Sequence, residues 1–87
     1  MNSLEAISFV KRGKNRTKVL KVLNKPMLPS EITKEIFGSC TNTSFNLVSR
    51  ALAELKEKEL VEVMNPDEKT GRIYQLTKKG QEVQKNL

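Results

Sequence analysis

The sequence contains no histidine and no tryptophan, and Cys40 is its single cysteine. Without histidine, acid–base catalysis near neutral pH loses its usual agent, and a nucleophilic cysteine loses its usual base. One cysteine cannot form an intramolecular disulfide, and a zinc site would need carboxylates alone. We therefore expect no enzyme activity, no metal and no cofactor, and we expect Cys40 to be a half-buried turn residue.

Long apolar runs are also missing. Apolar stretches reach only two or three residues, whereas a membrane-spanning helix needs about 20. Residues 1–5 lack the basic start and the apolar core of a signal peptide. These absences predict a cytoplasmic protein with no membrane partner.

Positive charge is what the sequence has in excess. The 87 residues include 16 lysines and arginines against 10 acidic residues, for a net charge of +6 and a pI near 9.7. A chain of this length is expected to form one domain. Its charge favours a polyanionic partner, although the same charge would also serve solubility alone.

Apolar residues recurring at helical spacing predict the first four helices. Pro26 ends the second, because a proline disfavours helical geometry in the residue before it. Pro29 begins the third and Gly38 stops it. The N-cap of the fourth is expected within residues 41–43. The predicted ranges are 1–12 (a helix or an arm), 14–24, 29–37 and 43–58.

Residues that favour β-strands follow this last helix. A polar, turn-forming stretch over 65–71 separates two such segments, so a β-hairpin is predicted over 60–76. Thr77 is a suitable cap for a C-terminal helix over 77–87. The expected fold class is α+β, mostly α, in a single domain over 1–87.

The predicted helix over 43–58 has two different faces. At 100° per residue, Leu52 and Leu55 fall within about 60° of Val48, whereas Asn46 and Arg50 lie about 160° away. A helix-turn-helix protein needs this division, with one face held to the domain and one reading bases in the major groove. The predicted DNA-contacting residues of this helix are Thr43, Ser44, Asn46, Leu47, Ser49 and Arg50. Its acidic residues lie in the C-terminal half, where Glu54 is spaced to pair with Lys58.

Two further groups of residues are candidates for phosphate contact. Lys69, Thr70 and Arg72 surround Gly71 at the tip of the predicted hairpin, and Arg72 could enter the minor groove. Lys14 and Arg16 belong to a dense basic cluster over 11–16. A solvated loop and a solvated linker are the alternatives that the residues leave open.

Two segments carry a resemblance to a known family. Residues 48–61, VSRALAELKEKELV, resemble the recognition helix and first wing strand of winged helix-turn-helix transcriptional regulators of the ArsR and MarR type. Residues 71–80, GRIYQLTKKG, look like the second wing strand and the start of the last helix. Together with 14–16 and 19–20 they are most similar to small archaeal members. The resemblance implies a three-helix core, a wing of two to three strands and terminal helices.

Glu59 and Leu28 depart from the family pattern. Where Glu59 stands the family usually has glycine, which closes the recognition helix in a left-handed conformation, so Glu59 should cost about 1 kcal/mol or the helix must end differently. Leu28 replaces a serine or threonine cap at the start of the preceding helix. The paired cysteine and histidine ligands of metal-sensing members are absent.

Homodimerisation through the terminal helices is also implied by the resemblance. Six apolar residues could form the interface or pack within the monomer, and the sequence leaves both readings open. They are Leu4, Ile7, Phe9, Val10, Val83 and Leu87.

Together these features predict a nucleoid-associated, sequence-specific regulator that binds double-stranded DNA. The alternative is a winged-helix protein-interaction module within a larger transcription or chromatin assembly, which should expose large apolar anchors. RNA binding is disfavoured, because Phe37, Phe45 and Tyr74 are expected in the core and leave no exposed aromatic row for base stacking.

Overall fold

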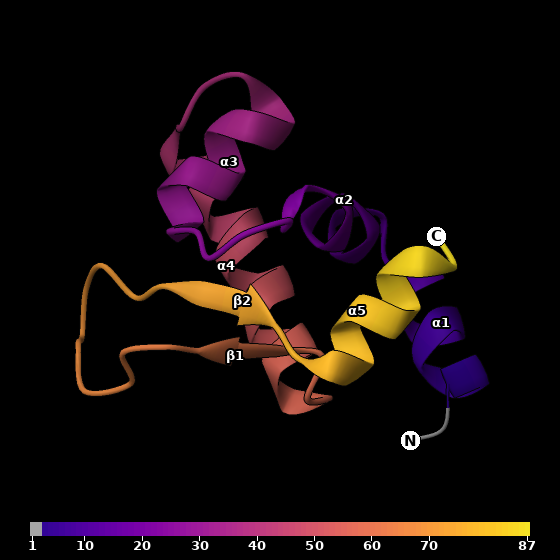
Figure 1. Cartoon of the computed structure of the whole chain (residues 1–87). Helices are drawn as coiled ribbons and strands as arrows, with labels where there is room; N and C mark the ends of the chain where they lie inside the picture. The colour runs from indigo at the N-terminus through magenta and orange to yellow at the C-terminus, as the bar shows by residue number, and fades with distance from the viewer. Residues whose placement is uncertain (1–2) are drawn as a thin grey trace.

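The computed structural model describes residues 3–87. Within them the chain forms an α+β, mostly helical fold with one antiparallel two-stranded sheet (Figure 1). The element order is α1 (Ser3–Lys11), α2 (Lys14–Val22), α3 (Pro29–Phe37), α4 (Asn42–Glu57), β1 (Val61–Val63), β2 (Tyr74–Leu76) and α5 (Lys78–Lys85). The predicted fold class is confirmed at this level, and residues 1 and 2 of the predicted N-terminal segment lie outside the described range. None of the helices over 3–87 has the length and apolar content of a membrane-crossing segment.

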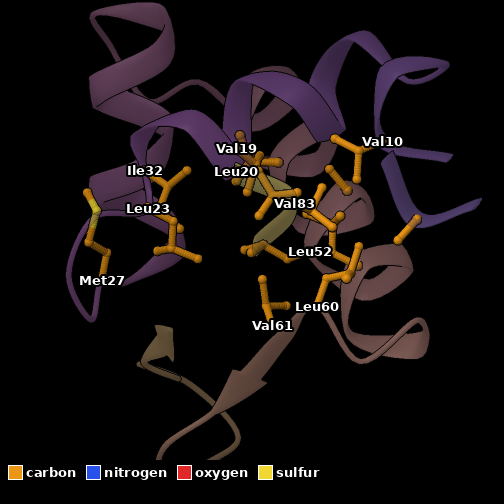
Figure 2. Close-up of a cluster of buried hydrophobic side chains, with 14 residues drawn as sticks. Val10, Val19, Leu20, Leu23, Met27, Ile32, Leu52, Leu60, Val61 and Val83 are labelled. Carbon is orange, nitrogen blue, oxygen red and sulfur yellow. The ribbon is translucent and has the colours of Figure 1, made fainter. Parts of the chain in front are cut away.

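Buried apolar side chains from all these helices meet in one core (Figure 2). The predicted inward face of α4 is confirmed, since Val48, Leu52 and Leu55 are fully buried. α4 packs against both α2 and α3, while α1 packs on α2 and α5. The buried members of the core are Ala6, Val10, Val19, Leu20, Leu23, Met27, Ile32, Val48, Ala51, Leu52, Leu55, Leu60, Val61 and Val83.

Two aromatic predictions were wrong. Phe37 and Phe45 are 38% and 37% exposed, whereas Tyr74 packs partly buried against the core. Phe37 is the last residue of α3, with the ammonium of Lys18 5.5 Å from its ring centroid. Phe45 stands about 60° around α4 from Val48, at the border of the buried face.

The second helix ends earlier than predicted, at Val22 instead of residue 24. A helix end leaves carbonyl groups without partners, and here a side chain from α5 supplies one. Gln84 Nε2 donates to the carbonyl of Leu20 at 2.7 Å and to Asn24 Oδ1 at 3.2 Å. This cap comes from a residue 64 positions away, so no local pattern could have indicated it.

α4 begins at Asn42 because Thr41 is its N-cap. Thr41 Oγ1 accepts from the backbone N–H of Ser44 at 3.2 Å, and Ser44 Oγ accepts from the backbone N–H of Thr41 at 3.0 Å. This reciprocal pair is a capping box with serine in the position usually held by glutamate or glutamine. The turn before it leaves Cys40 exposed, not half-buried as predicted.

The C-terminal end of α4 forms a Schellman motif. The N–H of Leu60 donates to the carbonyl of Leu55 at 2.9 Å, and that of Glu59 donates to the carbonyl of Lys56 at 2.9 Å. Glu59 has φ +62°, the left-handed conformation anticipated for its position. The helix body therefore stops at Glu57, one residue before the predicted end.

The two strands are shorter than the predicted segments on either side of the loop. Val61 pairs with Leu76, Glu62 with Gln75, and Val63 with Tyr74. On the other side of β2, Met27 and Tyr74 exchange two backbone hydrogen bonds of 2.9 Å in an isolated antiparallel bridge. The bridge fastens the α2–α3 connection to the hairpin. The last helix occupies only residues 78–85 of the predicted 77–87, with Thr77 as its N-cap.

Candidate nucleic-acid interface

Apart from Leu47, the outward face of α4 is polar over its first three turns. Thr43, Asn46, Leu47 and Arg50 are exposed there, and Ser49 is half-buried on the flank. No acidic residue occurs on this helix before Glu54. The predicted face is thus accessible, and its only charge in this half is the Arg50 guanidinium.

Ser44 does not belong to this face. Its side chain is 8% exposed and bonds to Thr41 within the capping box. On the helix it lies only about 40° from the buried Val48, so it points inward. The prediction that Ser44 contacts DNA is corrected: its role is to hold the start of α4.

A groove of about 390 Å³ joins α4 to the hairpin loop. Phe45 and Ser49 form its wall on α4, while the loop and the start of α3 form the others. Among residues 3–87, no aspartate or glutamate lines the groove, whereas Lys69 and Arg72 do. Its full lining is Leu28, Pro29, Ser30, Phe45, Ser49, Lys69, Thr70, Gly71, Arg72 and Tyr74. Of the predicted residues, the three on the loop and Ser49 of α4 therefore line one cationic groove.

Internal hydrogen bonds shape the hairpin loop. Asn65 Nδ2 donates to the carbonyl of Gly71 at 3.0 Å, while Asn65 Oδ1 accepts from the N–H of Ile73 at 2.7 Å. Arg72 Nε donates to the carbonyl of Glu68 at 2.8 Å. That bond uses one of the five donors of the guanidinium, so the others stay available to a ligand.

Arg16 is occupied within the protein. Its Nη1 donates to the carbonyl of Phe9 at 2.7 Å, its Nη2 bonds to Glu54 Oε2 at 2.9 Å, and its Cζ lies 4.0 Å from the ring centroid of Phe9. The predicted phosphate contact of Arg16 is therefore replaced by a structural role that ties α1 and α2 to α4. Glu54 consequently pairs with Arg16 and not with Lys58 as predicted.

Lys14 is exposed on the first turn of α2. It stands about 140° around that helix from the buried Val19, so it projects away from the core. The structure therefore separates Lys14 from the groove. Among the predicted residues, it gathers Ser49, Lys69, Thr70 and Arg72 around the groove and sets Thr43, Asn46, Leu47 and Arg50 on the adjoining face of α4.

Sequence reasoning missed the other residues that line the groove. Phe45 could have been found, because its angle on α4 lies between the buried face and the half-buried Ser49. Ser30 and Tyr74 reach the groove through the packing of α3 and through the bridge to Met27. Those are tertiary arrangements, and no spacing in the sequence signals them.

Comparisons with known proteins return no match to this chain among family models, curated proteins or solved structures. Within residues 3–87, histidine, cysteine, aspartate and glutamate side chains do not gather in any group of three or more that could hold a metal ion. The assignment of the α4 face and its groove as a candidate interface therefore rests on their geometry.

Proposed function

We propose that the chain is a winged helix-turn-helix protein that binds double-stranded DNA sequence-specifically and regulates transcription. In this reading α3 and α4 form the helix-turn-helix, α4 enters the major groove, and the β1–β2 hairpin is the wing. One observation carries the proposal: the outward face of α4, which is free of acidic residues before Glu54, adjoins a groove whose opposite wall holds Lys69 and Arg72.

The side chains on this face suit base edges in the major groove. Arg50 can donate two hydrogen bonds to guanine, and Asn46 can make two to adenine. Leu47 offers an apolar surface to a thymine methyl group. Thr43 and Ser49 carry hydroxyls that bond to bases or phosphates, so the face combines direct readout with positioning.

The hairpin loop would supply the backbone contacts. Lys69 and Thr70 are exposed at its tip, and Arg72 keeps free donors beside them. These groups suit phosphate oxygens, and an arginine also suits the negative potential of a narrow minor groove. Contacts of this kind position the protein without reading sequence.

The test begins with selection of bound sites from random duplexes and continues with fluorescence anisotropy on the selected duplex. Arg50→Ala is expected to weaken binding by about 1–3 kcal/mol, which is roughly 5- to 150-fold, and to blur the base preference. The matched control is Lys78→Ala, which removes an exposed positive charge on α5. Equal losses on selected and random duplexes would show that Arg50 touches only backbone. No binding of any duplex at low salt would overturn the proposal.

We further propose that the protein acts as a homodimer with two α4 helices about one DNA turn, near 34 Å, apart. The longest dimension of the Cα trace is 32 Å, so two chains side by side are compatible with that spacing. Val10 and Val83 are buried within the monomer and cannot serve as the interface. Leu4 is 78% exposed on α1 and is the strongest remaining apolar candidate.

A protein-interaction module is the second candidate function, because α4 also exposes large apolar side chains. Phe45 and Leu47 are 37% and 36% exposed. They stand on opposite flanks of Asn46, about 160° apart around the helix, so they do not form one anchor patch. The anisotropy experiment separates the two candidate functions. A protein-interaction module would show no duplex binding that depends on Arg50.

A further inference from the structure

The positive charge of the chain is concentrated in one segment outside the candidate interface. Residues 11–25 hold seven of the 16 lysines and arginines and none of the 10 acidic residues. The rest of the chain has nine cationic and 10 acidic residues, so it carries no net positive charge. The excess that first indicated a polyanionic partner therefore lies on α2 and its two flanks, and not on α4 or the hairpin.

Three of these seven cations project from α2 as a row. Lys14, Lys18 and Lys21 fall within about 60° of one another on the side opposite the buried Val19 and Leu20. Lys25 adds a fourth cation in the connection that follows the helix. Lys14, Lys21 and Lys25 are exposed, and none of them has an ion pair within residues 3–87. We call these four residues the α2 lysine row.

The arrangement of the row works against folding of the helix. Like charges spaced i, i+3 and i, i+4 repel, and Lys14 adds a cation at the helix N-terminus, where the macrodipole disfavours one. A helix face that merely meets water would usually interleave acidic residues to offset such repulsion. α2 has none, so its outward face is suited to a partner that supplies negative charge.

A duplex held by α4 would leave this row uncovered. α2 and α4 pack against each other through their buried faces. Val19 and Leu20 of α2 and Leu52 of α4 point into the same core (Figure 2), so the outward face of each helix lies on the side away from that core. The base-reading face and the α2 lysine row cannot both lie flat on one straight segment of DNA.

The chemistry of the row favours a phosphate backbone over a membrane. Its rise from Lys14 to Lys21 is about 10 Å, a length over which duplex DNA presents about six phosphate charges. α2 itself presents no exposed large apolar side chain, and Phe37 of α3, whose ring centroid lies 5.5 Å from the Lys18 ammonium, is a single residue and not an apolar helix face that could enter a lipid surface. Interfacial helices need such an apolar face.

We propose that the α2 lysine row is a second, sequence-independent binding surface for duplex DNA, so that the protein joins two duplex segments. The proposal rests on the proposed function for the first segment, which α4 holds. The second segment is held through its phosphates alone, and its affinity should fall steeply with salt.

The experiment is a capture assay with the intact chain. A duplex selected for α4 binding is fixed to beads and loaded with protein, and a fluorescent random-sequence duplex of ~30 base pairs is then added; capture of that duplex reports the second surface. The triple variant Lys14→Gln, Lys21→Gln, Lys25→Gln should keep binding to the selected duplex within about threefold, yet capture at least tenfold less of the second. The slope of log K for capture against log salt should fall by roughly 0.9 per lysine removed.

A matched triple variant controls for net charge. Lys34→Gln, Lys56→Gln and Lys78→Gln remove the same charge from exposed positions on three other helices and should preserve capture. Equal loss in both triple variants would overturn the proposal, as would equal loss of the selected duplex in the row variant. Full capture of the second duplex by the row variant would also overturn the proposal. Such a result is expected if a dimer bridges two duplexes through its two α4 helices. Row-dependent binding to anionic vesicles without any capture of the second duplex would likewise overturn the proposal.

The two proposals fail in different ways. If the selected duplex binds with Arg50 dependence but no second duplex is captured, only the α2 lysine row loses its role. If the wild-type protein binds neither duplex, the proposed function fails and this inference fails with it.

Discussion

Glu59 is the non-glycine residue with positive φ among those that the structure describes. A side chain in the left-handed region brings Cβ close to the following carbonyl, at a cost of roughly 1–2 kcal/mol. The Schellman motif at the end of α4 imposes this conformation. The strain at Glu59 therefore comes from the way α4 ends. The chain has to turn there because the next residue, Leu60, is buried in the core before β1 begins.

Glu59→Gly is expected to stabilise the protein by about 0.5–1 kcal/mol, because glycine adopts positive φ without a steric cost. At this chain length that corresponds to a rise in Tm of about 2–8 °C. The ion pair lost with Lys79 is 3.9 Å long and Glu59 is exposed, so its removal costs little. Thermal unfolding followed by circular dichroism measures the change. Glu59→Asn should fall between the two, and a lower Tm for the glycine variant would contradict this reading of the helix stop.

Gly80 is required for a different reason, because the backbones of α5 and the α4–β1 connection meet at this position. A Cβ added there would lie 1.9 Å from the carbonyl oxygen of Leu60. Gly80→Ala should therefore destabilise the protein by about 1–3 kcal/mol or more, since backbone has to move. Urea unfolding checks this, with Gln81→Ala at the adjacent exposed position as the control. Near-equal midpoints for both variants would refute the close approach.

At the scale of elements, α4 separates residues that build the helix from residues that would read DNA. Thr41→Ala removes the N-cap and should cost about 1 kcal/mol of stability. Thr43→Ala, two residues further on, should leave stability within ~0.5 kcal/mol and weaken binding to a selected duplex. Parallel unfolding and anisotropy measurements on the two variants test this division. It is contradicted if Thr41→Ala leaves the unfolding midpoint unchanged.

Substitution of Arg16 separates two possible roles of this residue, which are packing α1 and α2 against α4 and contacting DNA phosphates. Arg16→Ala should lower stability, because it leaves the carbonyl of Phe9 and the Glu54 carboxylate without their partner. It should leave the salt slope of DNA binding unchanged, whereas Lys69→Ala should reduce that slope by about 1. Binding constants measured across a salt series decide this. A shallower slope for Arg16→Ala would return Arg16 to the DNA contacts.

The sequence predicted elements better than it predicted partners between elements. The apolar spacing of α4 correctly placed Val48 inside and Arg50 outside, because a regular helix converts sequence separation into angle. Arg16 and Ser44 were misassigned as DNA contacts because each bonds within the protein, Arg16 to Glu54 and Ser44 to the backbone of Thr41. Composition alone does not show that these polar groups already have partners. The groove between α4 and the hairpin could not be predicted for the same reason, because it forms only when α3, α4 and β2 pack together.

At the scale of the whole molecule, the hairpin and the terminal helices lie at opposite sides (Figure 1). α1 packs on α2 and α5, far from the loop that would touch DNA. A dimer formed through this side would leave both hairpins free. The position of Leu4 makes that arrangement testable.

Leu4→Glu is expected to shift a dimer toward the monomer, because it places a charge in the exposed apolar centre of the proposed interface. Sedimentation velocity over a concentration series measures the shift, with Ser39→Glu, at an exposed position between α3 and α4, as the control. The variant should fold normally, since Leu4 makes little contribution to the core. A wild-type protein that is monomeric at every concentration would contradict the dimer.

The exposed Cys40 at the turn into α4 offers a native attachment point for a spectroscopic probe. Because it is the single thiol of the chain, a nitroxide would attach there alone and no engineered cysteine would be needed. Two labelled chains on one DNA site would report a single distance between their turns by electron paramagnetic resonance. That distance would show directly whether two α4 helices occupy neighbouring turns of the same groove.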